Sequence, residues 1–235
     1  MACRDVAGRH ASVRRFKKED VDERDLNAIL EAARRAPTSW NLQPLTVIVV
    51  RRPDLKSAIA EAIGGQEHVA KAPVLLVFSI DYSKVVAAAE GSGVKVAGIG
   101  LASLIEASID VGLAAGWAGL VAEELGYGIV YVAVYSNPCR VAEILHLPKL
   151  TLPLVGLCIG RPAERVAPRP RQPMEVFASH DGYLQLPRGD VARLVAQPFG
   201  QKASRLYSHV LGAGGYHALV NEEMVRCARS RGFNV

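Results

Sequence analysis

The sequence is poor in aromatic residues, which make up 6% of its 235 residues, and it lacks a paired cysteine motif. Its four cysteines, Cys3, Cys139, Cys158 and Cys227, include no C-x-x-C pair, so neither zinc nor any other metal site is expected. Cys158 lies in an apolar run and is interpreted as a core thiol. This cysteine usage predicts a reduced, intracellular protein of cytoplasmic location.

Signatures of dinucleotide-binding and membrane proteins are also missing. No G-x-G-x-x-G follows the first expected strand and opens a helix, which argues against a Rossmann fold. Residues 1–11 are polar and basic, unlike a signal peptide. The long apolar stretch 96–121 is interrupted by Glu106, Asp110 and several glycines, which argues against a membrane span.

The charge is modestly positive, with a formal net charge of +5. Lysines and arginines are spread along the chain, and no aromatic residues alternate with a basic run. A nucleic-acid-binding protein usually gathers its charge on one face or tail, so this class is not favoured. The excess of positive charge instead fits solubility and an anionic small ligand.

The hydrophobic pattern predicts an α+β protein in which helices flank a mixed central β-sheet. Helices are expected at 22–35, 55–63, 96–125 and 140–145, and strands at 45–50, 74–80, 126–134 and 153–159. The helix at 96–125 is apolar almost all round and is therefore expected to be buried. Residues 1–235 are expected to form one domain with a C-terminal helical extension from about residue 185. Within it, 191–195 and 218–229 are expected to be helical, with a turn at 212–215.

Four short motifs carry polar or cationic side chains suited to ligand binding. His10, Ser12 and Arg14 alternate along an extended segment, and a phosphate monoester needs such a cation together with hydroxyl or backbone donors. A solvated basic arm would have the same composition. The stretch around Thr38 and Asn41 offers hydroxyl and amide groups to a polar ring edge or a ribityl chain, and ordinary turn chemistry would explain it too.

The other two motifs are a glycine pair and an arginine pair. Gly64 and Gly65 precede Gln66. The two glycines would let the backbone approach a ligand closely, or they would simply end a helix. Arg169 and Arg171 flank a proline that keeps them on a stiff extended stretch. Two neighbouring positive charges favour the binding of an anion, although a solvated surface would also carry them.

In their order and spacing, these motifs resemble the FMN-dependent nitroreductase superfamily. They most resemble its branch of NADPH-dependent nitro and flavin reductases, which opens with His-x-Ser-x-Arg. The resemblance runs from about residue 10 to residue 183 and includes the strand Pro-Leu-Val-Gly-Leu-Cys-Ile-Gly at 153–160. It implies a nitroreductase-like fold and an intertwined homodimer with FMN at the subunit interface. It also implies NADPH or NADH as the co-substrate.

The resemblance assigns roles to individual residues. The FMN phosphate and ribityl chain would be held by His10, Ala11, Ser12, Val13 and Arg14. The flavin would be lined from the partner subunit by Thr38, Ser39 and Asn41, and Gln66 would hydrogen-bond to it. The strand backbone beside the ring would come from Tyr131, Val132, Ala133 and Val134. The phosphate and ring-edge electrostatics would be completed by Arg169 and Arg171, with Lys202 and Arg205 as candidates for the NADPH phosphate.

The chain departs from this branch at several positions. Ala11 stands where many relatives carry a second arginine, so Arg14 should carry more of the phosphate contact. Ala133 and Val134 replace a glycine pair, and their side chains are expected to narrow the space beside the flavin. Trp40 is bulkier than the usual small residue and is expected to shape the pocket. The sequence after Phe199 matches poorly, which leaves the choice between NADPH and NADH open.

The reaction implied by the resemblance is hydride transfer from NAD(P)H through FMN to nitroaromatics, quinones or free flavin, with ping-pong kinetics in one shared pocket. The flavin carries the chemistry, so no side-chain nucleophile or general base is expected. Two alternatives stay open. One is a flavin-binding sensor or storage protein without turnover, and the other is a different reaction on the same fold.

Overall fold

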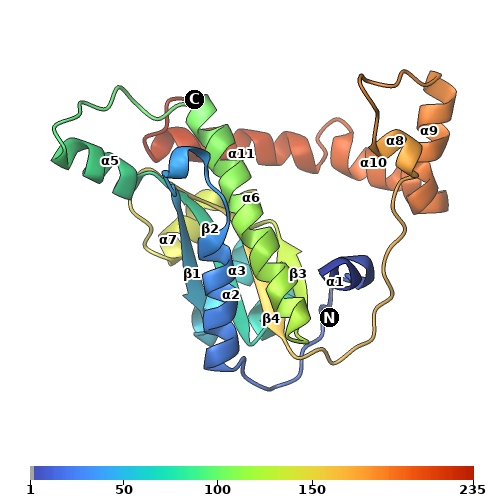
Figure 1. The fold of residues 1–235 in the computed structure, drawn as a ribbon, viewed down its shortest axis with the longest axis horizontal. Helices are drawn as coiled ribbons and strands as arrows, with labels where there is room; N and C mark the ends of the chain where they lie inside the picture. Colours follow the sequence, from blue (N-terminus) through green and yellow to red (C-terminus); the bar gives the residue numbers. More distant parts are fainter. Residues whose placement is uncertain (1–2) are drawn as a thin grey trace. The chain divides into compact units, whose positions relative to one another are not determined.

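The computed structural model describes residues 3–235 (Figure 1). The chain forms two compact units, one made of the residues up to Val166 together with Glu222–Val235, and the other made of Ala167–Asn221. The helical extension expected from about residue 185 lies in the second unit, apart from its last residues, which belong to the first.

A four-stranded sheet forms the centre of the first unit. Its strands lie in the order β1 (Leu45–Val50), β2 (Val74–Asp81), β4 (Thr151–Gly160) and β3 (Gly128–Val132). All three neighbouring pairs are antiparallel, whereas a mixed sheet was expected. The order of elements along the chain does not specify the direction of each strand, and this is why the expectation failed. All four expected strands are present, with small shifts at their ends.

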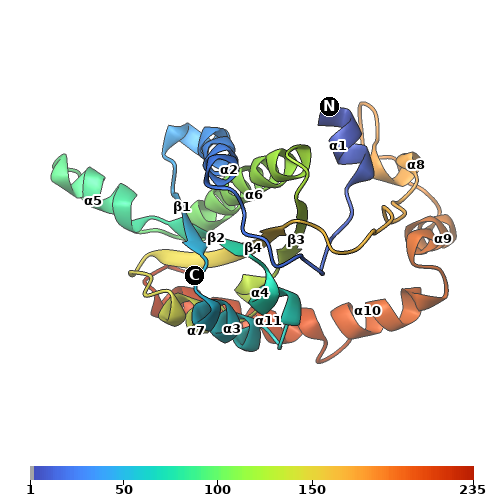
Figure 2. The same cartoon turned by 90° about the horizontal axis from the view of Figure 1, so that it is seen from below.

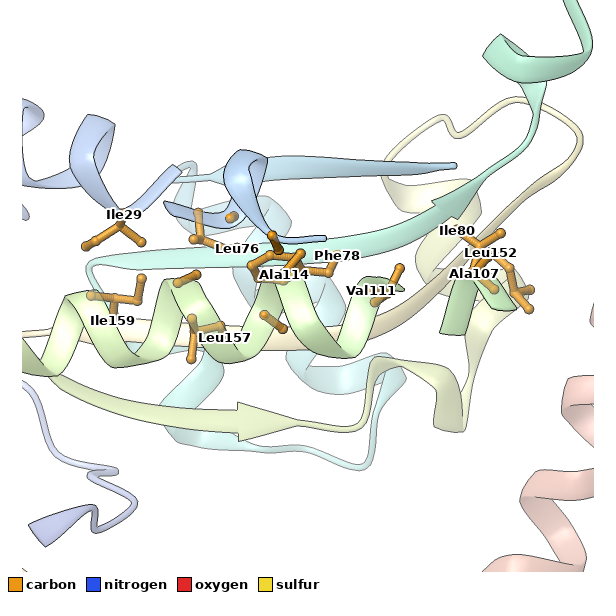
Figure 3. Close-up of a cluster of buried hydrophobic side chains, with 14 of the residues drawn as sticks. Ile29, Leu76, Phe78, Ile80, Ala107, Val111, Ala114, Leu152, Leu157 and Ile159 are labelled. Atoms are coloured by element: carbon orange, nitrogen blue, oxygen red, sulfur yellow. The ribbon is translucent and has the colours of Figure 1, made fainter. Parts of the chain in front are cut away.

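Each face of the sheet is covered by helices, because side chains alternate between the two faces of a strand. On β2, Leu76, Phe78 and Ile80 belong to the core under α2 (Glu23–Arg35) and α6 (Leu101–Glu124), as Figure 3 shows. Residues of β2 in the other register, such as Leu75, pack on the opposite face. That face is covered by α3 (Pro53–Ala62), α4 (Glu67–Lys71) and α7 (Pro138–Ile144), as Figure 2 shows.

Helix α2 forms where the sequence predicted it. The Asp22 side chain caps its start by accepting hydrogen bonds from the backbone N–H groups of Arg24, at 2.8 Å, and Asp25, at 3.3 Å. One face of the helix is buried through Leu26, Ile29 and Ala33. Capping and amphipathic spacing are both local signals, which explains why this helix could be located from the sequence.

Helix α6 differs from the expectation of an all-round buried helix. Small residues such as Ala107 and Ala114 pack it tightly against the sheet. A second set of large apolar side chains, repeating every fourth residue, stays exposed: Leu101, Ile105, Ile109, Leu113 and Trp117. We refer to this set as the α6 stripe. By length and composition alone α6 could cross a membrane, so its charged residues do not exclude a span. Its inner face belongs to the core of the first unit.

Several short elements were not predicted from the sequence. In the first unit they are α1 (Cys3–Arg9), α4, α5 (Ser83–Gly91), η1 (Ser39–Asn41) and η2 (Val134–Ser136). In the second unit they are α8 (Met174–Phe177), η3 (Gln197–Lys202) and α10 (Ala203–Leu211). The helices expected at 191–195 and 218–229 are present as α9 (Arg188–Ala196) and α11 (Tyr216–Ser230), of which α11 begins in the second unit. Within it, the rings of Phe199 and Tyr207 meet edge to face with centroids 5.9 Å apart. Helices shorter than three turns give little hydrophobic periodicity, and this explains most of these omissions.

The cysteines also differ from the expectation of a fully reduced protein. Cys139, at the start of α7, and Cys227, in α11, form a disulfide with their Cα atoms 5.4 Å apart. The two residues are separated by 88 positions in the sequence, so no local motif could reveal the pair. Cys158 is a fully buried free thiol, as predicted, and burial raises its pKa to about 12.

Candidate functional site

The segment containing His10 and Arg14 runs beside strand β3. The backbone N–H of Val13 donates to the carbonyl oxygen of Ile129 at 2.8 Å, and its side chain packs closely against Gly128. The Glu164 carboxylate accepts hydrogen bonds from the backbone N–H groups of Arg14, at 2.7 Å, and Arg15, at 3.0 Å. These hydrogen bonds lower the pKa of Glu164. The backbone is therefore fixed, while the Arg14 side chain is exposed.

His10 is held by the last turn of α6. Its Nδ1 lies 2.9 Å and 3.0 Å from the two carboxylate oxygens of Glu123. A carboxylate only accepts hydrogen bonds when ionised, so this contact places a proton on Nδ1 and fixes the orientation of the ring. Glu123 could not be predicted from the sequence, because it lies 113 positions from His10.

The loop before α4 brings a second histidine to Arg14. Gly64 and Gly65 adopt φ values of +93° and +73°, which glycine tolerates without strain, and Gln66 follows them. The buried Nε2 of His68 has no hydrogen-bond partner among the described residues. Burial and the nearby charge of Arg14 lower the pKa of His68. We refer to Arg14 and His68 as the candidate anion-binding pair, because the charge of Arg14 acts on a histidine whose Nε2 has no partner among the described residues.

The end of β3 offers backbone groups rather than polar side chains to the candidate site. The Tyr131 hydroxyl donates to the Ala115 carbonyl oxygen at 2.9 Å, and burial, followed by the charge of Glu123, raises the pKa of Tyr131 to about 12. Val132 and Val134 are buried in the core, whereas Ala133, which lies between them, is half-buried. The expectation that the side chains of Ala133 and Val134 narrow the space beside the flavin stays a prediction.

The Thr38–Asn41 loop is anchored to a different part of α6. The buried carboxylate of Asp110 accepts hydrogen bonds from the Ser39 backbone N–H and hydroxyl. The Thr38 hydroxyl oxygen is buried and has no partner among residues 3–235. Asp110 and Glu123 are 13 residues apart, which corresponds to about 20 Å along a helix. The loop and the His10 anchor are therefore well separated within one chain.

The remaining predicted residues lie in the second unit. A cavity of about 1300 Å³ there is lined by Arg169, Arg171 and Lys202, together with apolar side chains that include Phe177 and Phe199. Arg205 does not line this cavity. Within residues 3–235, no group of three or more His, Cys, Asp or Glu side chains is arranged to hold a metal ion.

Comparison with known proteins places this arrangement in a family. The model of the nitroreductase family matches residues 7–161, which include the candidate anion-binding pair and all four strands. The chain belongs to the nitroreductase family. The match ends before Arg169, so the second unit lies outside it.

Individual nitroreductase relatives are similar over most of this chain. An FMN reductase [NAD(P)H] of Bacillus subtilis is 40% identical over 178 residues, covering 74% of this chain and 72% of the relative. An oxygen-insensitive NADPH nitroreductase of Salmonella typhimurium is 35% identical over 186 residues, covering 78% and 75%. The solved structure of the hypothetical oxidoreductase YcnD from Bacillus subtilis is 31% identical, with a TM-score of 0.88 and coverage of 100% and 99%. The nitroreductase-like fold is thereby confirmed.

Proposed function

We propose that this chain is a flavin-dependent oxidoreductase that transfers hydride from NAD(P)H through FMN to a nitroaromatic, a quinone or free flavin by a ping-pong mechanism. The observation that carries the proposal is the candidate anion-binding pair, in which the charge of the exposed Arg14 side chain acts on His68, whose buried Nε2 has no hydrogen-bond partner among the described residues. The names of its relatives, an FMN reductase and an NADPH nitroreductase, support the same chemistry.

The residues around Arg14 fit the phosphate of FMN. A guanidinium can donate two parallel hydrogen bonds to a phosphate, and a neutral imidazole still offers one N–H donor. Glu164 holds the backbone of Arg14 in place, so little freedom has to be lost when an anion binds. The Ser12 hydroxyl, two residues away, would add a donor. Ala11 supplies no second cation, which leaves Arg14 as the main charge.

The chain would bind and orient the flavin, and would carry out no chemistry of its own. When bound, FMN would accept hydride from the reduced nicotinamide and pass it to the acceptor. His10, fixed by Glu123, and Gln66, on its glycine turn, would position the ribityl chain and ring, with the backbone of Tyr131–Val134 alongside. The Thr38–Asn41 loop would line the flavin of a partner subunit, and its separation from His10 along α6 supports this division.

A homodimer would cover the apolar surface that one chain leaves exposed. The α6 stripe borders an apolar groove of about 470 Å³, which is closed on its other side by Met224, Val225 and Val235. An exposed patch of this kind on a water-soluble enzyme marks an interaction surface. We propose that a second copy of the chain occupies it, in a cytoplasmic protein.

The cavity of the second unit fits the adenosine end of NADPH. Arg169, Arg171 and Lys202 provide positive charge for a phosphate, and Phe177 and Phe199 provide rings for a base to stack on. Lys202→Ala is expected to raise KM for NADPH severalfold while leaving KM for NADH nearly unchanged. Equal effects on both would remove Lys202 from the 2′-phosphate. A role for Arg169 and Arg171 in charge stabilisation at the flavin stays a prediction, as does a role for Arg205.

The proposed function is tested with the purified protein under anaerobic conditions. We expect a yellow protein with a flavin spectrum, which bleaches on addition of NADH or NADPH and recolours on addition of a quinone. A yellow protein that never bleaches would favour the sensor or storage alternative. A colourless protein that cannot be reconstituted with FMN would contradict the proposal. Bleaching without reoxidation by nitroaromatics, quinones or flavin would indicate another reaction on this fold.

A further inference from the structure

The disulfide between Cys139 and Cys227 joins two parts of the first unit that are distant in sequence. Cys227 is fully buried in α11, whereas Cys139 is half-buried at the start of α7. The loop between the two cysteines contains β4 and the whole of the second unit, Ala167–Asn221. The bond therefore closes at the point where the chain returns to the first unit.

The C-terminal segment that carries Cys227 is also held by hydrogen bonds. The Arg231 side chain donates to the carbonyl oxygens of Thr151, at 2.6 Å, and Leu147, at 2.7 Å. The backbone N–H of Asn234 donates to the carbonyl oxygen of Ile99 at 2.8 Å. These contacts would keep the segment near its place if the disulfide were opened, so the bond is not the only attachment.

On the other side, Cys139 lies next to elements of the proposed flavin site. Asn137, two residues before it, donates from its side-chain amide to the carbonyl oxygen of Ala62 at 3.1 Å, at the end of α3. The turn with Gly64, Gly65 and Gln66 begins two residues after Ala62. The chain immediately before Asn137 is η2, which continues from β3. Cys139 is thus separated from both segments by only a few residues.

We propose that Cys139 and Cys227 form a reversible redox clasp that fixes the C-terminal segment to α7 and tightens the binding of FMN. This inference rests on the proposed function. In a reducing cytoplasm, a disulfide is usually transient, catalytic or redox-sensing rather than purely structural. One half-buried cysteine and one fully buried cysteine suit such a role, because thiol–disulfide exchange begins at the sulfur that a small thiol can reach.

The exchange needs only thiols and small disulfides. A small thiolate attacks Sγ of Cys139, the bond between Cys139 and Cys227 breaks, and Cys227 leaves as a thiolate that takes up a proton. A second small thiol then attacks the mixed disulfide on Cys139 and releases a small disulfide. The protein gains two electrons and two protons, and the two small thiols are oxidised. A small disulfide reverses both steps and closes the clasp.

The first part of the test counts thiols by alkylation and mass measurement after purification in air. Denatured protein should be alkylated at two of its four cysteines, and at all four after reduction with a dithiol. Four alkylated cysteines without prior reduction would overturn the proposal. Cys139→Ser should leave Cys227 reactive, and Cys158→Ala, which changes a free buried thiol, serves as the matched control.

The second part compares the rate of FMN release from oxidised and reduced holoprotein by the rise in flavin fluorescence. Reduction should speed release by at least about fivefold, in the usual range of coupling between two sites. Cys139→Ser should release FMN at the reduced rate under both conditions, while Cys158→Ala should respond as the natural protein does. An unchanged rate would overturn the link to FMN.

The same comparison separates this proposal from the proposed function. If the protein never binds FMN, the proposed function fails, and with it the effect on FMN. The redox clasp itself is then tested by thermal unfolding. Reduction should lower Tm in the natural protein and in Cys158→Ala but not in Cys139→Ser. A Tm that is the same before and after reduction would overturn the clasp as well.

Discussion

Asp110, in the middle of α6, uses a fully buried carboxylate to hold Ser39. It accepts hydrogen bonds from the Ser39 backbone N–H at 3.0 and 3.2 Å and from the Ser39 hydroxyl at 3.4 Å. The loop that follows is strained, because Trp40, Asn41 and Gln43 adopt φ values of +55°, +57° and +53°. Left-handed backbone costs a non-glycine residue about 1 kcal/mol or more, so the loop depends on its anchor.

Removing that anchor is expected to cost stability. Asp110→Ala leaves the Ser39 N–H without its acceptor and should lower the free energy of unfolding by about 1–3 kcal/mol. Asp110→Asn keeps one acceptor oxygen and should lose less. Urea unfolding of the three proteins checks the order. If the Ala and Asn variants were equally stable, the hydrogen bonds to Ser39 would not be what Asp110 contributes.

A close contact between Gly119 of α6 and the Tyr131 side chain gives a second prediction about this helix. A Cβ at this position would lie 2.0 Å from the Tyr131 hydroxyl oxygen, so Gly119→Ala forces the ring of Tyr131 to move. We expect a loss of about 1–3 kcal/mol, as for other overpacked cores. Adding Tyr131→Phe should recover part of it, because the clashing atom is removed. Gly189→Ala, where a Cβ meets nothing within 4 Å, is the control.

The elements that could be predicted from the sequence are those with strong local signals. The strand Leu45–Val50 was located to the residue because a β-branched run is bounded by a proline on one side and arginines on the other. The outer face of α6 was misjudged, since a helix that is apolar all round does not reveal which side meets the sheet. The antiparallel strand directions and the Cys139–Cys227 bond depend on tertiary structure alone.

In the candidate site, too, some residues could be predicted from the sequence and others depend on tertiary structure. His10, Arg14 and Gln66 could be selected because their order along the chain resembles a family. Their acidic partners could not be selected, because Glu123 and Glu164 reach His10 and Arg14 across 113 and 150 positions. His68 follows the predicted glycine motif by only two residues, but its buried Nε2 without a partner among the described residues, and the effect of Arg14 on its pKa, are visible only in the structure.

Arg14 is expected to dominate the affinity for FMN. Removing a charged hydrogen-bond donor costs about 1.5–3 kcal/mol, so Arg14→Ala should weaken FMN binding by about 10- to 140-fold and yield a largely apo protein. Arg15→Ala is the matched control, because its exposed side chain lies next in the sequence and its backbone is held by the same Glu164. Isothermal titration with FMN measures both. Near-normal occupancy in Arg14→Ala would remove Arg14 from the phosphate site.

The α6 stripe is expected to hold a homodimer together. Ile109→Glu places a carboxylate in the middle of the stripe, where burial against a second copy would require its desolvation. The variant should sediment as a monomer at concentrations at which the natural protein is a dimer. Ala88→Glu adds the same charge on the exposed helix α5 and should leave the dimer intact. A dimer that persists in Ile109→Glu would place the interface elsewhere.

His68 gives the FMN-free protein a defined dependence on pH. Burial, and secondly Arg14, hold the pKa of His68 below its usual value of 6.5 in the folded chain. As the pH falls below 6.5, the unfolded chain takes up a proton on this residue before the folded chain does, so stability is full above that pH and declines below it. The urea midpoint should therefore be lower at pH 5.5 than at pH 7.5, and His68→Gln should reduce the difference. Saturating FMN should also reduce it, because a phosphate beside His68 favours the protonated ring. A difference that is the same in His68→Gln would assign the effect to other groups.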